Sequence, residues 1–542
     1  MTNKLVIVES PAKARKISSY LGKDYNVIAS IGHVRDLPVP SELPEEMKKG
    51  PFSKFAVNVE NDFEPYYAIM KGKKKIVRDI KKQLKDANEL YLATDEDREG
   101  EAISWHLVEE LKPEMPVKRM VFQEITEDAI KVALANTRDL NLDLVQAQET
   151  RRILDRLFGY ELSPFLWRKI KRGLSAGRVQ SVATRLIVDR ERERIKFVSA
   201  SFADLLASFE KQDNVNIPFS AKLTEVDAKQ IAQAKDFNDE GKLISGKGKV
   251  VYHLTEKAAK ELKAALDKSK SAFELIDRTE KGYTRKPYMP YTTSTLQQDA
   301  SRRLRASVRD IMSAAQSLYE NGFITYMRTD SPSLSAEATK AARDQATSHF
   351  GKDCVPAAPR VYAVKSKNAQ EAHEAIRPAG AKFKDPEALT GVSDFEKELY
   401  TLIWRRTLAS QMNDVKGVTV NYKLQKDNAV FSASGTTITD KGFLAVYADL
   451  DNEKSDADNQ KLPNLEKGTL IEEGTTELFA HETTPPARYT EASLIKKLEE
   501  LSIGRPSTYA STIATLRTRG YITEKRNPLI PTWTAFAVVS LL

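Results

Sequence analysis

Residues 89–101, ELYLATDEDREGE, indicate the fold of the first part of the chain. An apolar, strand-forming run comes first, and three acidic residues follow it at alternate positions: Asp95, Asp97 and Glu99. A helical pattern then covers residues 101–111. A strand that ends in polar groups and leads into a helix is typical of a parallel α/β domain, which binds ligands at the carboxyl ends of its strands. We therefore expect a functional site at this edge of the sheet.

The beginning of the chain has the same arrangement. Leu5–Val8 is a continuous apolar run that ends at Glu9, and Ser10-Pro11 starts an amphipathic helical pattern. Glu9 would lie at the same edge as the acidic triplet, because parallel strands end together there. Carboxylate oxygens suit Mg²⁺, and Lys13, near the helix N-terminus, is placed to meet a phosphate.

The acidic run also resembles the first six positions of a calcium-binding EF-hand loop. Position twelve of that loop requires Glu, but the sequence has His106 there, and the run before the triplet is strand-like rather than helical. These two features exclude an EF-hand. A solvated acidic turn that binds nothing stays open as an alternative.

Composition limits the classes of protein. The chain has 542 residues, 41% of them hydrophobic, which is enough for several packed domains. The single cysteine, Cys354, excludes a disulfide framework and a Cys-only zinc site within the chain. The longest apolar run, 535–542, is far shorter than the roughly 20 residues that cross a bilayer, and the first residues lack a signal-peptide pattern. We expect a multidomain cytoplasmic protein with no membrane contact.

Residues 241–248, GKLISGKG, match a nucleotide-binding P-loop poorly. Gly248 stands where Ser or Thr would bind Mg²⁺, and no apolar strand leads into the run. A polar loop is the better interpretation, and the sequence has no Gly-rich dinucleotide motif. We therefore expect chemistry that does not use ATP.

Positive charge is concentrated between Arg151 and Lys196, where 13 Lys and Arg residues accompany 5 Asp and Glu residues. This local excess of +8 equals the net charge of the whole chain. Arg190–Arg194 alternates in sign, as in a solvated, ion-paired helix. Arg151–Arg178 has few acidic residues to balance it, so we expect a surface there that binds the phosphates of a polyanion.

A tyrosine and an arginine lie two residues apart in the run 322–331, GFITYMRTDS. In an extended segment Tyr326 and Arg328 share one face. A phenol beside a guanidinium is a workable nucleophile, because the cation favours phenolate and stabilises a pentavalent phosphate. The alternative is an ordinary packing residue, since the chain has 19 tyrosines.

Two further runs carry groups that bind phosphates. His373 and Arg377 lie four residues apart and would share a face if the segment is helical. Three side chains precede a later helical pattern, where a helix N-terminus would favour an anion: Arg505, Ser507 and Thr508. The alternatives are an exposed helix end before a proline and a capped helix start without a ligand.

The hydrophobic patterns divide the chain into blocks. An α/β block over 1–140 includes a strand at 25–31 and a lysine-rich helix at 66–84. The later blocks are helical over 141–200, short strands over 201–276, a hinge at 287–290, helical over 291–405, strands over 418–478 and helical over 490–518.

Taken in order, these runs resemble the motifs of the type IA family of bacterial DNA topoisomerases. The matching runs are 6–13 (VIVESPAK), 32–38 (GHVRDLP), the acidic triplet, 151–160, 175–181 (SAGRVQS), 290–293 (PYTT), 322–331, 373–378 and 504–510. Any one of them alone could be accidental, but all of them stand in the family's order across nearly the whole chain.

The resemblance implies a fold and an activity. The family fold is a ring of four domains around a central hole: a Toprim α/β domain (1–140), a winged-helix-like DNA-binding domain (141–200 with 479–542), a β-rich arch (201–285 with 406–478) and a helical domain with the nucleophilic tyrosine (286–405). The family cuts one DNA strand through a 5′-phosphotyrosine, passes a strand through the gap and reseals it. Negative supercoils are thereby relaxed without ATP.

The resemblance also implies roles for single residues. Tyr326 matches the nucleophile and Arg328 its partner. Four residues match an Mg²⁺ centre: Glu9, Asp95, Asp97 and Glu99. Glu9 and Lys13 are candidates for protonating or stabilising the leaving 3′-oxygen. The residues expected to contact DNA are His33, Arg151, Arg152, Asp155, Arg156, Arg178, Gln180, Ser181, His373, Arg377, Arg505, Ser507 and Thr508.

The expected partner is DNA, at single-stranded regions of a negatively supercoiled duplex, and the expected state is a nucleoid-associated monomer. Many family members carry C-terminal zinc ribbons or basic repeats that this sequence lacks, so we expect a catalytic core without its tail. Three alternatives stay open: a topoisomerase III-like decatenase, a Toprim metal-dependent nuclease and a non-catalytic single-strand-binding scaffold.

Overall fold

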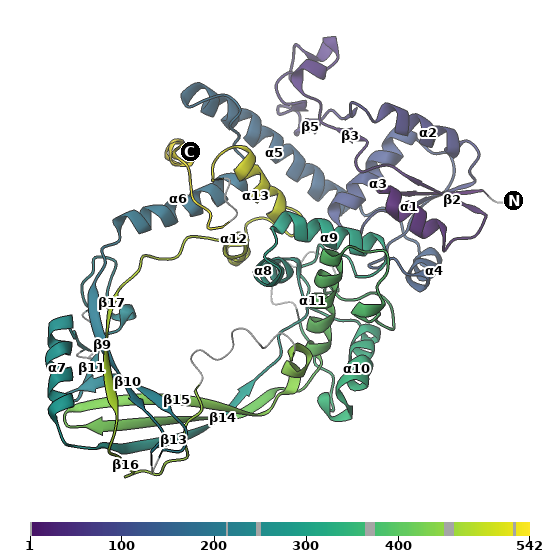
Figure 1. The fold of residues 1–542 in the computed structure, drawn as a ribbon. Helices are drawn as coiled ribbons and strands as arrows, with labels where there is room; N and C mark the ends of the chain where they lie inside the picture. Colours follow the sequence, from purple (N-terminus) through teal and green to yellow (C-terminus); the bar gives the residue numbers. More distant parts are fainter. Residues whose placement is uncertain (1–2, 213–214, 245–250, 364–373, 449–459, 524–526) are drawn as a thin grey trace.

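The computed structural model describes residues 3–212, 215–244, 251–363, 374–448, 460–523 and 527–542. His373 and the end of the run 241–248 lie outside the described residues. Figure 1 shows the chain as a ring, in which several helices form one side and a curved β-sheet forms the other, and the N-terminal domain lies outside the ring beside the helices. The predicted combination of an α/β domain, helical parts and a β-rich arch is confirmed. In the part of the chain that the structure describes, no helix is both long and apolar enough to cross a membrane.

The N-terminal domain contains a parallel four-stranded sheet with the order β2-β1-β7-β8. Its strands are β1 (Lys4–Val8), β2 (Tyr25–Ala29), β7 (Glu89–Leu92) and β8 (Val117–Arg119). The apolar runs form strands because both faces of the sheet are covered: Val6 and Val8 pack into one core, and Leu5 and Ile7 into another. The helices of the domain are α1 (Pro11–Ser18), α2 (Lys74–Leu84), α3 (Arg98–Leu111) and α4 (Glu127–Ala135).

The helix that we expected from residue 66 begins only at Lys74, so that prediction was wrong in its first half. The preceding residues form β6 (Ala68–Ile69), which pairs with β3 (Arg35–Asp36). Gly72 then has a φ of 90°, a left-handed conformation that ends the extended segment. The remaining short elements of this region are β4 (Val57–Asn58), β5 (Glu64–Pro65) and 3₁₀ turns at Pro40–Glu42 and Glu45–Met47.

Two long helices follow the N-terminal domain and pack against the last helices of the chain. The five helices are α5 (Leu142–Lys169), α6 (Gln180–Lys196), α12 (Glu491–Glu500), α13 (Tyr509–Thr518) and α14 (Trp533–Leu541). Leu166 and Ile187 share one buried core with Leu494, Ile513 and Val538. This common core supports grouping the two segments into one body.

The far side of the ring is a nine-stranded sheet, antiparallel except where β11 meets β12. Its strands are β9 (Ser201–Phe209), β10 (Phe219–Val226), β11 (Lys229–Ile231), β12 (Val251–Tyr252), β13 (Phe273–Arg285), β14 (Val415–Lys426), β15 (Ala429–Asp440), β16 (Leu470–Ile471) and β17 (Thr475–Glu482). A 3₁₀ turn at Ala234–Asp236 and a helix, α7 (Glu256–Lys268), interrupt the block for which we expected strands alone. The Thr255 hydroxyl caps α7, and Ala259 and Leu266 bury its apolar side.

The helical body between β13 and β14 carries Tyr326. Its helices are α8 (Thr293–Arg303), α9 (Val308–Glu320), α10 (Ala336–Phe350) and α11 (Asp394–Ser410), with 3₁₀ turns at Lys352–Cys354 and Pro386–Ala388. A third 3₁₀ turn, Gly442–Tyr447, follows β15 and packs into the same core. Ile311 and Leu318 of α9 lie in the same buried core as Val8 and Ile125 of the N-terminal domain. The two bodies are therefore packed together in this structure.

The segment before Pro378 is extended, so the helix expected there is absent from its described residues. Ile376 forms a β-bridge with Tyr291, and Pro378 forms one with Ile324. These bridges attach the segment to the strand-like stretch that leads to Tyr326. Arg377 is therefore not on a helix, and the part of the prediction that concerns His373 lies outside the described residues.

Candidate active site

Glu9 and Asp95 follow the carboxyl ends of β1 and β7, and a buried lysine lies between them. Ser10 caps α1, and its side chain accepts a hydrogen bond from the backbone N–H of Lys13. The Lys13 ammonium is fully buried and forms ion pairs with Glu9 and with Asp95. Adjacent parallel strands thus bring together residues that are 82 positions apart in the sequence.

A tyrosine that we did not select from the sequence completes this cluster. The Tyr319 hydroxyl, on α9 of the helical body, donates a hydrogen bond to Asp95 Oδ1 at 3.0 Å. Lys13 Nζ lies 4.9 Å from the centre of the Tyr319 ring, a cation–π distance. The same ring meets the ring of Tyr326 edge-on, with 5.2 Å between centroids. Tyr319 therefore connects the acidic cluster of one body to the candidate nucleophile of the other.

The pKa values of the two carboxyls beside Lys13 are shifted in opposite directions. Burial alone would raise the pKa of Asp95, but the Lys13 ammonium outweighs it and holds that pKa at about 2. Burial raises the pKa of Glu9 well above its ordinary value, and the nearby charge of Asp95 adds to this rise. Asp95 is therefore an anion, whereas Glu9 retains a proton to higher pH, a division of roles suited to acid–base chemistry.

Tyr326 lies at the interface, with its phenol directed at the acidic triplet. Its backbone N–H donates to the carbonyl of Gln123 at 2.8 Å, and its hydroxyl donates to Asp97 Oδ2 at 2.5 Å. Burial raises the pKa of Tyr326 well above its ordinary value, the charges of Asp97 and Asp95 add to this, and Arg328 opposes it. The expected phenolate is thus not favoured in this conformation. The phenol is neutral and already bound to a carboxylate that can accept its proton.

Arg328 lies beside two carboxylates of the triplet, those of Asp97 and Glu99. Its Nη1 lies 2.9 Å from Glu99 Oε2 and 3.7 Å from Asp97 Oδ2. His33 Nε2 lies 3.9 Å from Glu99 Oε1, so the histidine stands behind the same carboxylate. Burial lowers the pKa of His33, against the opposing charge of Glu99. Arg328 is positioned to stabilise negative charge near the Tyr326 oxygen.

The donor set fits Mg²⁺ in its chemistry. Among the described residues, no three His, Cys, Asp or Glu side chains are grouped closely enough to hold a metal ion as they stand. Mg²⁺ needs only one or two carboxylates together with water and phosphate oxygens. Asp97 and Glu99 both line a cavity of about 270 Å³, and both lie beside a single guanidinium. These two carboxylates, with Asp95 behind them, could hold the ion.

The same cavity gathers cationic and hydroxyl side chains from three separate segments. Arg151 comes from α5, Arg328 from the tyrosine segment, and Arg505, Ser507 and Thr508 from the turn before α13. The Thr508 hydroxyl accepts a hydrogen bond from the backbone N–H of Arg505 at 2.8 Å, which fixes this turn. The predicted anion-binding turn therefore shares one cavity with Arg328 and with the carboxylates of Asp97 and Glu99.

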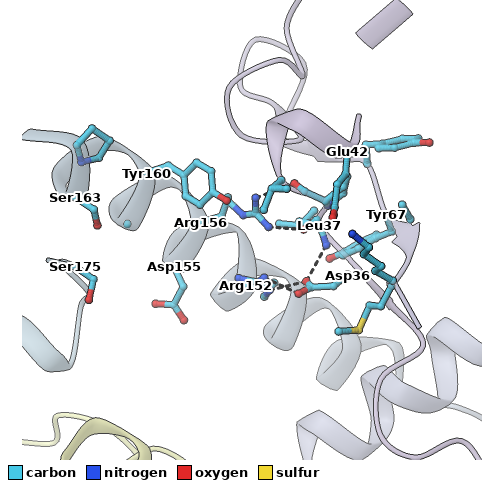
Figure 2. A pocket seen from close by; sticks show the side chains of 18 of the residues that line it. Asp36, Leu37, Glu42, Tyr67, Arg152, Asp155, Arg156, Tyr160, Ser163 and Ser175 are labelled. Atoms are coloured by element: carbon cyan, nitrogen blue, oxygen red, sulfur yellow. Dashed lines mark hydrogen bonds and ion pairs between the residues drawn. The ribbon is translucent and has the colours of Figure 1, made fainter. Parts of the chain in front are cut away.

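A second cavity, of about 1340 Å³, lies between α5 and the segment after β3. Figure 2 shows Arg152 and Arg156 of α5 directed toward Asp36 and Leu37, with Asp155 and Tyr160 on the same helix. Arg152 forms two hydrogen bonds with Asp36, at 2.8 and 2.7 Å, and these fix the guanidinium in the cavity wall.

The neighbouring side chains give this cavity a stacking surface. Arg156 donates to the carbonyls of Pro38 and Leu37 and lies over the Tyr160 ring, 4.5 Å from its centre. Asp155 accepts from Arg178 at 2.8 Å. A cavity with fixed arginines and an aromatic ring suits an unpaired base and its phosphate.

Three of the expected DNA contacts are placed differently. Gln180 donates to the Ser175 hydroxyl, and the Ser181 hydroxyl accepts from the backbone of Gly177, so both organise the turn before α6. Neither residue is among those that line the two cavities. Arg377 is buried and forms ion pairs with Glu124 at 2.9 Å and with Glu374. This placement does not support a direct phosphate contact by Arg377 in this conformation.

Known proteins share this arrangement over almost the whole chain. A family model described as DNA topoisomerase matches residues 139–542, and a model of the Toprim domain matches residues 4–125. The chain belongs to the type IA family of bacterial DNA topoisomerases. It is 52% identical over 554 residues to DNA topoisomerase 1 of Mycolicibacterium smegmatis and 52% identical over 552 residues to that of Streptomyces coelicolor. These alignments cover 99% of this chain and 59% and 57% of the two relatives.

A solved structure supports the assignment. The structure of full-length topoisomerase I from Thermotoga maritima superimposes with a TM-score of 0.80 at 37% sequence identity, covering 99% of this chain and 82% of that one. The chain spans less than two thirds of the length of the two relatives from Mycolicibacterium smegmatis and Streptomyces coelicolor. Toprim domains bind metal in topoisomerases, which agrees with the carboxylate donors at the edge of this sheet.

The Toprim domain of this chain has a buried ion-pair network that our sequence analysis missed. Arg119, at the end of β8, pairs with Glu101 of α3 at 2.9 Å, and both side chains are 0–1% exposed. Arg119 also donates to four backbone carbonyls, those of Leu92, Thr94, Asp95 and Met120. We call these contacts the Arg119 clasp. The clasp fixes the backbone that carries Asp95, and nothing in the local sequence distinguishes Arg119 from an ordinary surface arginine.

The Toprim domain also forms a hydrogen-bonded interface with the tyrosine-bearing body. Glu124 pairs with Arg377 and accepts from the backbone N–H of Gly380, and Gln123 accepts from the backbone N–H of Tyr326. We call this set of contacts the gate seam. Gly322 belongs to it sterically, because a side chain there would lie 2.3 Å from the carbonyl oxygen of Ile125.

Proposed function

We propose that this chain is the catalytic part of a topoisomerase that relaxes negatively supercoiled DNA without ATP. In this proposal Tyr326 cuts one strand, holds its 5′ end as a phosphotyrosine while another strand passes, and then releases it by religation. The observation that carries the proposal is the contact of the Tyr326 phenol with Asp97, beside Arg328 and across an interface between two bodies.

Cleavage would be a transesterification, in which one phosphoester bond replaces another. As the phenol oxygen attacks phosphorus, its proton passes to Asp97, which already accepts it at 2.5 Å. The new bond joins phosphorus to the Tyr326 oxygen, and the bond from phosphorus to the 3′-oxygen breaks. Glu9, which retains a proton, and the Lys13 ammonium are the acids near enough to the Asp95 edge to protonate the leaving 3′-oxygen. Arg328 would stabilise the charge on the phosphate.

Religation needs no external energy, because a phosphotyrosine ester replaces a phosphodiester of similar energy. The 3′-hydroxyl returns its proton to the group that supplied it, Glu9 or Lys13, and attacks phosphorus, while the Tyr326 oxygen leaves and regains its proton from Asp97. When bound, Mg²⁺ would be held by Asp97 and Glu99, with Asp95 nearby, and would reduce the repulsion between these carboxylates and the DNA phosphates.

We propose that the DNA strand runs through both cavities. The active-site cavity would hold the phosphates around the cut, with Arg151, Arg505 and Thr508 as donors. The larger cavity would hold the strand on one side of the cut, with Arg152 and Arg156 on its phosphates and a base against Tyr160. The fixed arginines support this path, because they hold their geometry before DNA arrives.

Strand passage would require the gate seam to separate while Tyr326 keeps hold of the DNA. The four domains proposed for this motion are 1–140, 141–200 with 479–542, 201–285 with 406–478, and 286–405. We further propose that the chain acts as a monomer on single-stranded regions of nucleoid DNA in the cytoplasm.

A plasmid assay tests the proposal. Negatively supercoiled plasmid is incubated with the full chain and Mg²⁺ in the absence of ATP, and topoisomers are separated on a gel. The control variant is Tyr400→Phe, which removes the hydroxyl of another tyrosine in the same core, one that donates to the carbonyl of Lys384. We expect wild type and Tyr400→Phe to relax the plasmid and Tyr326→Phe to leave it supercoiled. Nicked or linear DNA with all three proteins would point to a nuclease instead.

A further inference from the structure

The helix α2 lies in a run of unusually high positive charge. Residues 71–85, KGKKKIVRDIKKQLK, contain eight basic residues and one acidic residue, a net charge of +7 in a chain whose total is +8. Val77, Ile80 and Leu84 bury the apolar side of the helix, so the charged side chains are directed outward. This concentration of charge takes no part in the mechanism proposed above.

Four of these cations form a stripe that we call the α2 stripe: Lys75, Arg78, Lys82 and Lys85. They are all exposed and spaced three or four residues apart, so they follow one face of the helix over about 15 Å. Among the described residues, the ion pair of this helix joins Lys81 to Glu110, and the four cations of the stripe have no carboxylate partner.

The α7 helix provides a contrast within the same molecule. It is also rich in lysine, but Lys260 pairs with Glu256 at 2.6 Å and Lys263 pairs with Asp267 at 2.5 Å. Such pairs at four-residue spacing are the usual way in which a solvated helix balances its own charge. The α2 stripe lacks this balance, which is typical of a surface that meets an external polyanion.

The stripe adjoins the proposed path of the DNA strand. Lys71, three residues before α2, and Lys74, its first residue, line the larger cavity together with Arg152 and Arg156. On α5, Arg151 faces the active-site cavity, whereas its neighbour Arg152 faces the larger one. A strand that leaves the active site through the larger cavity therefore reaches the first lysines of α2.

We propose that the α2 stripe extends this path and binds the phosphates of single-stranded DNA beyond the larger cavity. The inference rests on the proposed function, because it takes the strand to occupy that cavity. It adds a binding surface remote from the cut, where the strand is held by charge and not by base contacts. The stripe would keep hold of the DNA while the active site opens.

The magnitude follows from counterion release. Each phosphate neutralised on a single strand contributes about 0.7 to the slope of log affinity against log salt, so four contacts contribute about 2.8. Between 50 and 200 mM salt, wild-type affinity for a long strand should therefore fall about 50-fold more than that of a variant without the stripe.

The test measures the affinity of the full chain for fluorescent oligonucleotides by anisotropy over this salt range. The stripe variant is Lys75→Gln with Arg78→Gln, Lys82→Gln and Lys85→Gln. The matched control changes the same number of charges on α7: Lys257→Gln, Lys260→Gln, Lys263→Gln and Lys268→Gln. One oligonucleotide is just long enough to fill the two cavities, and two others extend it by ten nucleotides at the 5′ or the 3′ end.

We expect the stripe variant to lose affinity and salt slope for one extended oligonucleotide only, with the short oligonucleotide and the α7 control unaffected. Equal loss on all oligonucleotides, or no loss on any, would overturn the proposal. So would a loss seen only with a hairpin duplex, since the stripe would then bind duplex DNA. If wild type fails to bind the short oligonucleotide, the proposed function itself fails, and the two failures are thereby distinguished.

Discussion

Replacing Glu101 by Gln should destabilise the Toprim domain severely, although the two side chains have the same shape. Glu101 accepts from Arg119 at 2.9 Å and from Arg138 at 2.8 Å, and it also accepts from the backbone N–H of Asn141. Glu101→Gln removes the carboxylate charge that balances the fully buried guanidinium of Arg119. Breaking one partner of a buried ion pair costs about 3–5 kcal/mol, because the other charge stays buried without compensation.

The loss should appear as a fall in unfolding temperature. For a domain of this size, 1 kcal/mol corresponds to about 4 °C, so the Toprim transition should shift by about 10–20 °C. The chain has four tryptophans, and Trp105 lies on α3 beside the Arg119 clasp. Thermal unfolding of the full chain, followed by Trp105 fluorescence with the other three tryptophans replaced by Phe, reports this transition.

Glu110→Gln is the matched control, since it removes a carboxylate from the same helix. Its partner is the exposed Lys81, 2.8 Å away, and exposed pairs contribute less than about 1 kcal/mol. A shift no larger for Glu101→Gln than for Glu110→Gln would refute the reasoning, because the clasp would then be no more than a surface contact.

Three further predictions concern the active site and its seam. Glu9→Gln should lower the cleavage rate about 100-fold and remove its decline at alkaline pH, measured as adduct formed against pH. The pKa of Glu9 is raised in the folded state, so the folded chain holds a proton above pH 4.5 that the unfolded chain has lost. Wild-type stability should therefore fall as pH rises from 4.5 through the folded-state pKa. This fall should be absent in Glu9→Gln. Gly322→Ala should reduce the yield of covalent adduct at least about 5-fold, because φ is +75° there and the new methyl group meets the carbonyl oxygen of Ile125. An unchanged yield would show that the backbone of the gate seam shifts to accept the methyl group without loss of activity. Glu124→Gln should speed amide hydrogen exchange along the gate seam about 10-fold or more, because it leaves the buried guanidinium of Arg377 with one carboxylate, that of Glu374. Unchanged exchange would show that the Glu124–Arg377 pair does not hold the seam closed.

Much of the fold could be predicted from the sequence where the pattern is local. The apolar runs before Glu9 and Asp95 predict buried parallel strands, because both faces of such a strand are covered. The helix expected from residue 66 was wrong in its first half, since β6 pairs with a strand more than 30 residues earlier. The extended segment at Arg377 was missed for the same reason, because its bridges are made to distant residues.

The residues of the active site could likewise be predicted from the sequence only in part. The acidic triplet, Tyr326 and Arg328 carry chemistry in their residue types and spacing, and the structure brings them within contact distance. Tyr319 and Arg119 act through partners that lie far away in the sequence, Asp95 and Glu101 among them. No local pattern marks such residues, since a buried tyrosine and a strand-end arginine usually serve packing and solubility.

The central claim is that Tyr326 attacks DNA and retains the 5′ end of the cut strand. Single-stranded DNA labelled at its 3′ end, or separately at its 5′ end, is mixed with wild type and with Tyr326→Phe, quenched with SDS and resolved on a denaturing gel. The account predicts that the 3′-labelled fragment alone becomes attached to protein and that Tyr326→Phe abolishes the attachment. Cleavage to free ends by both proteins would contradict it and would make the acidic centre a nuclease.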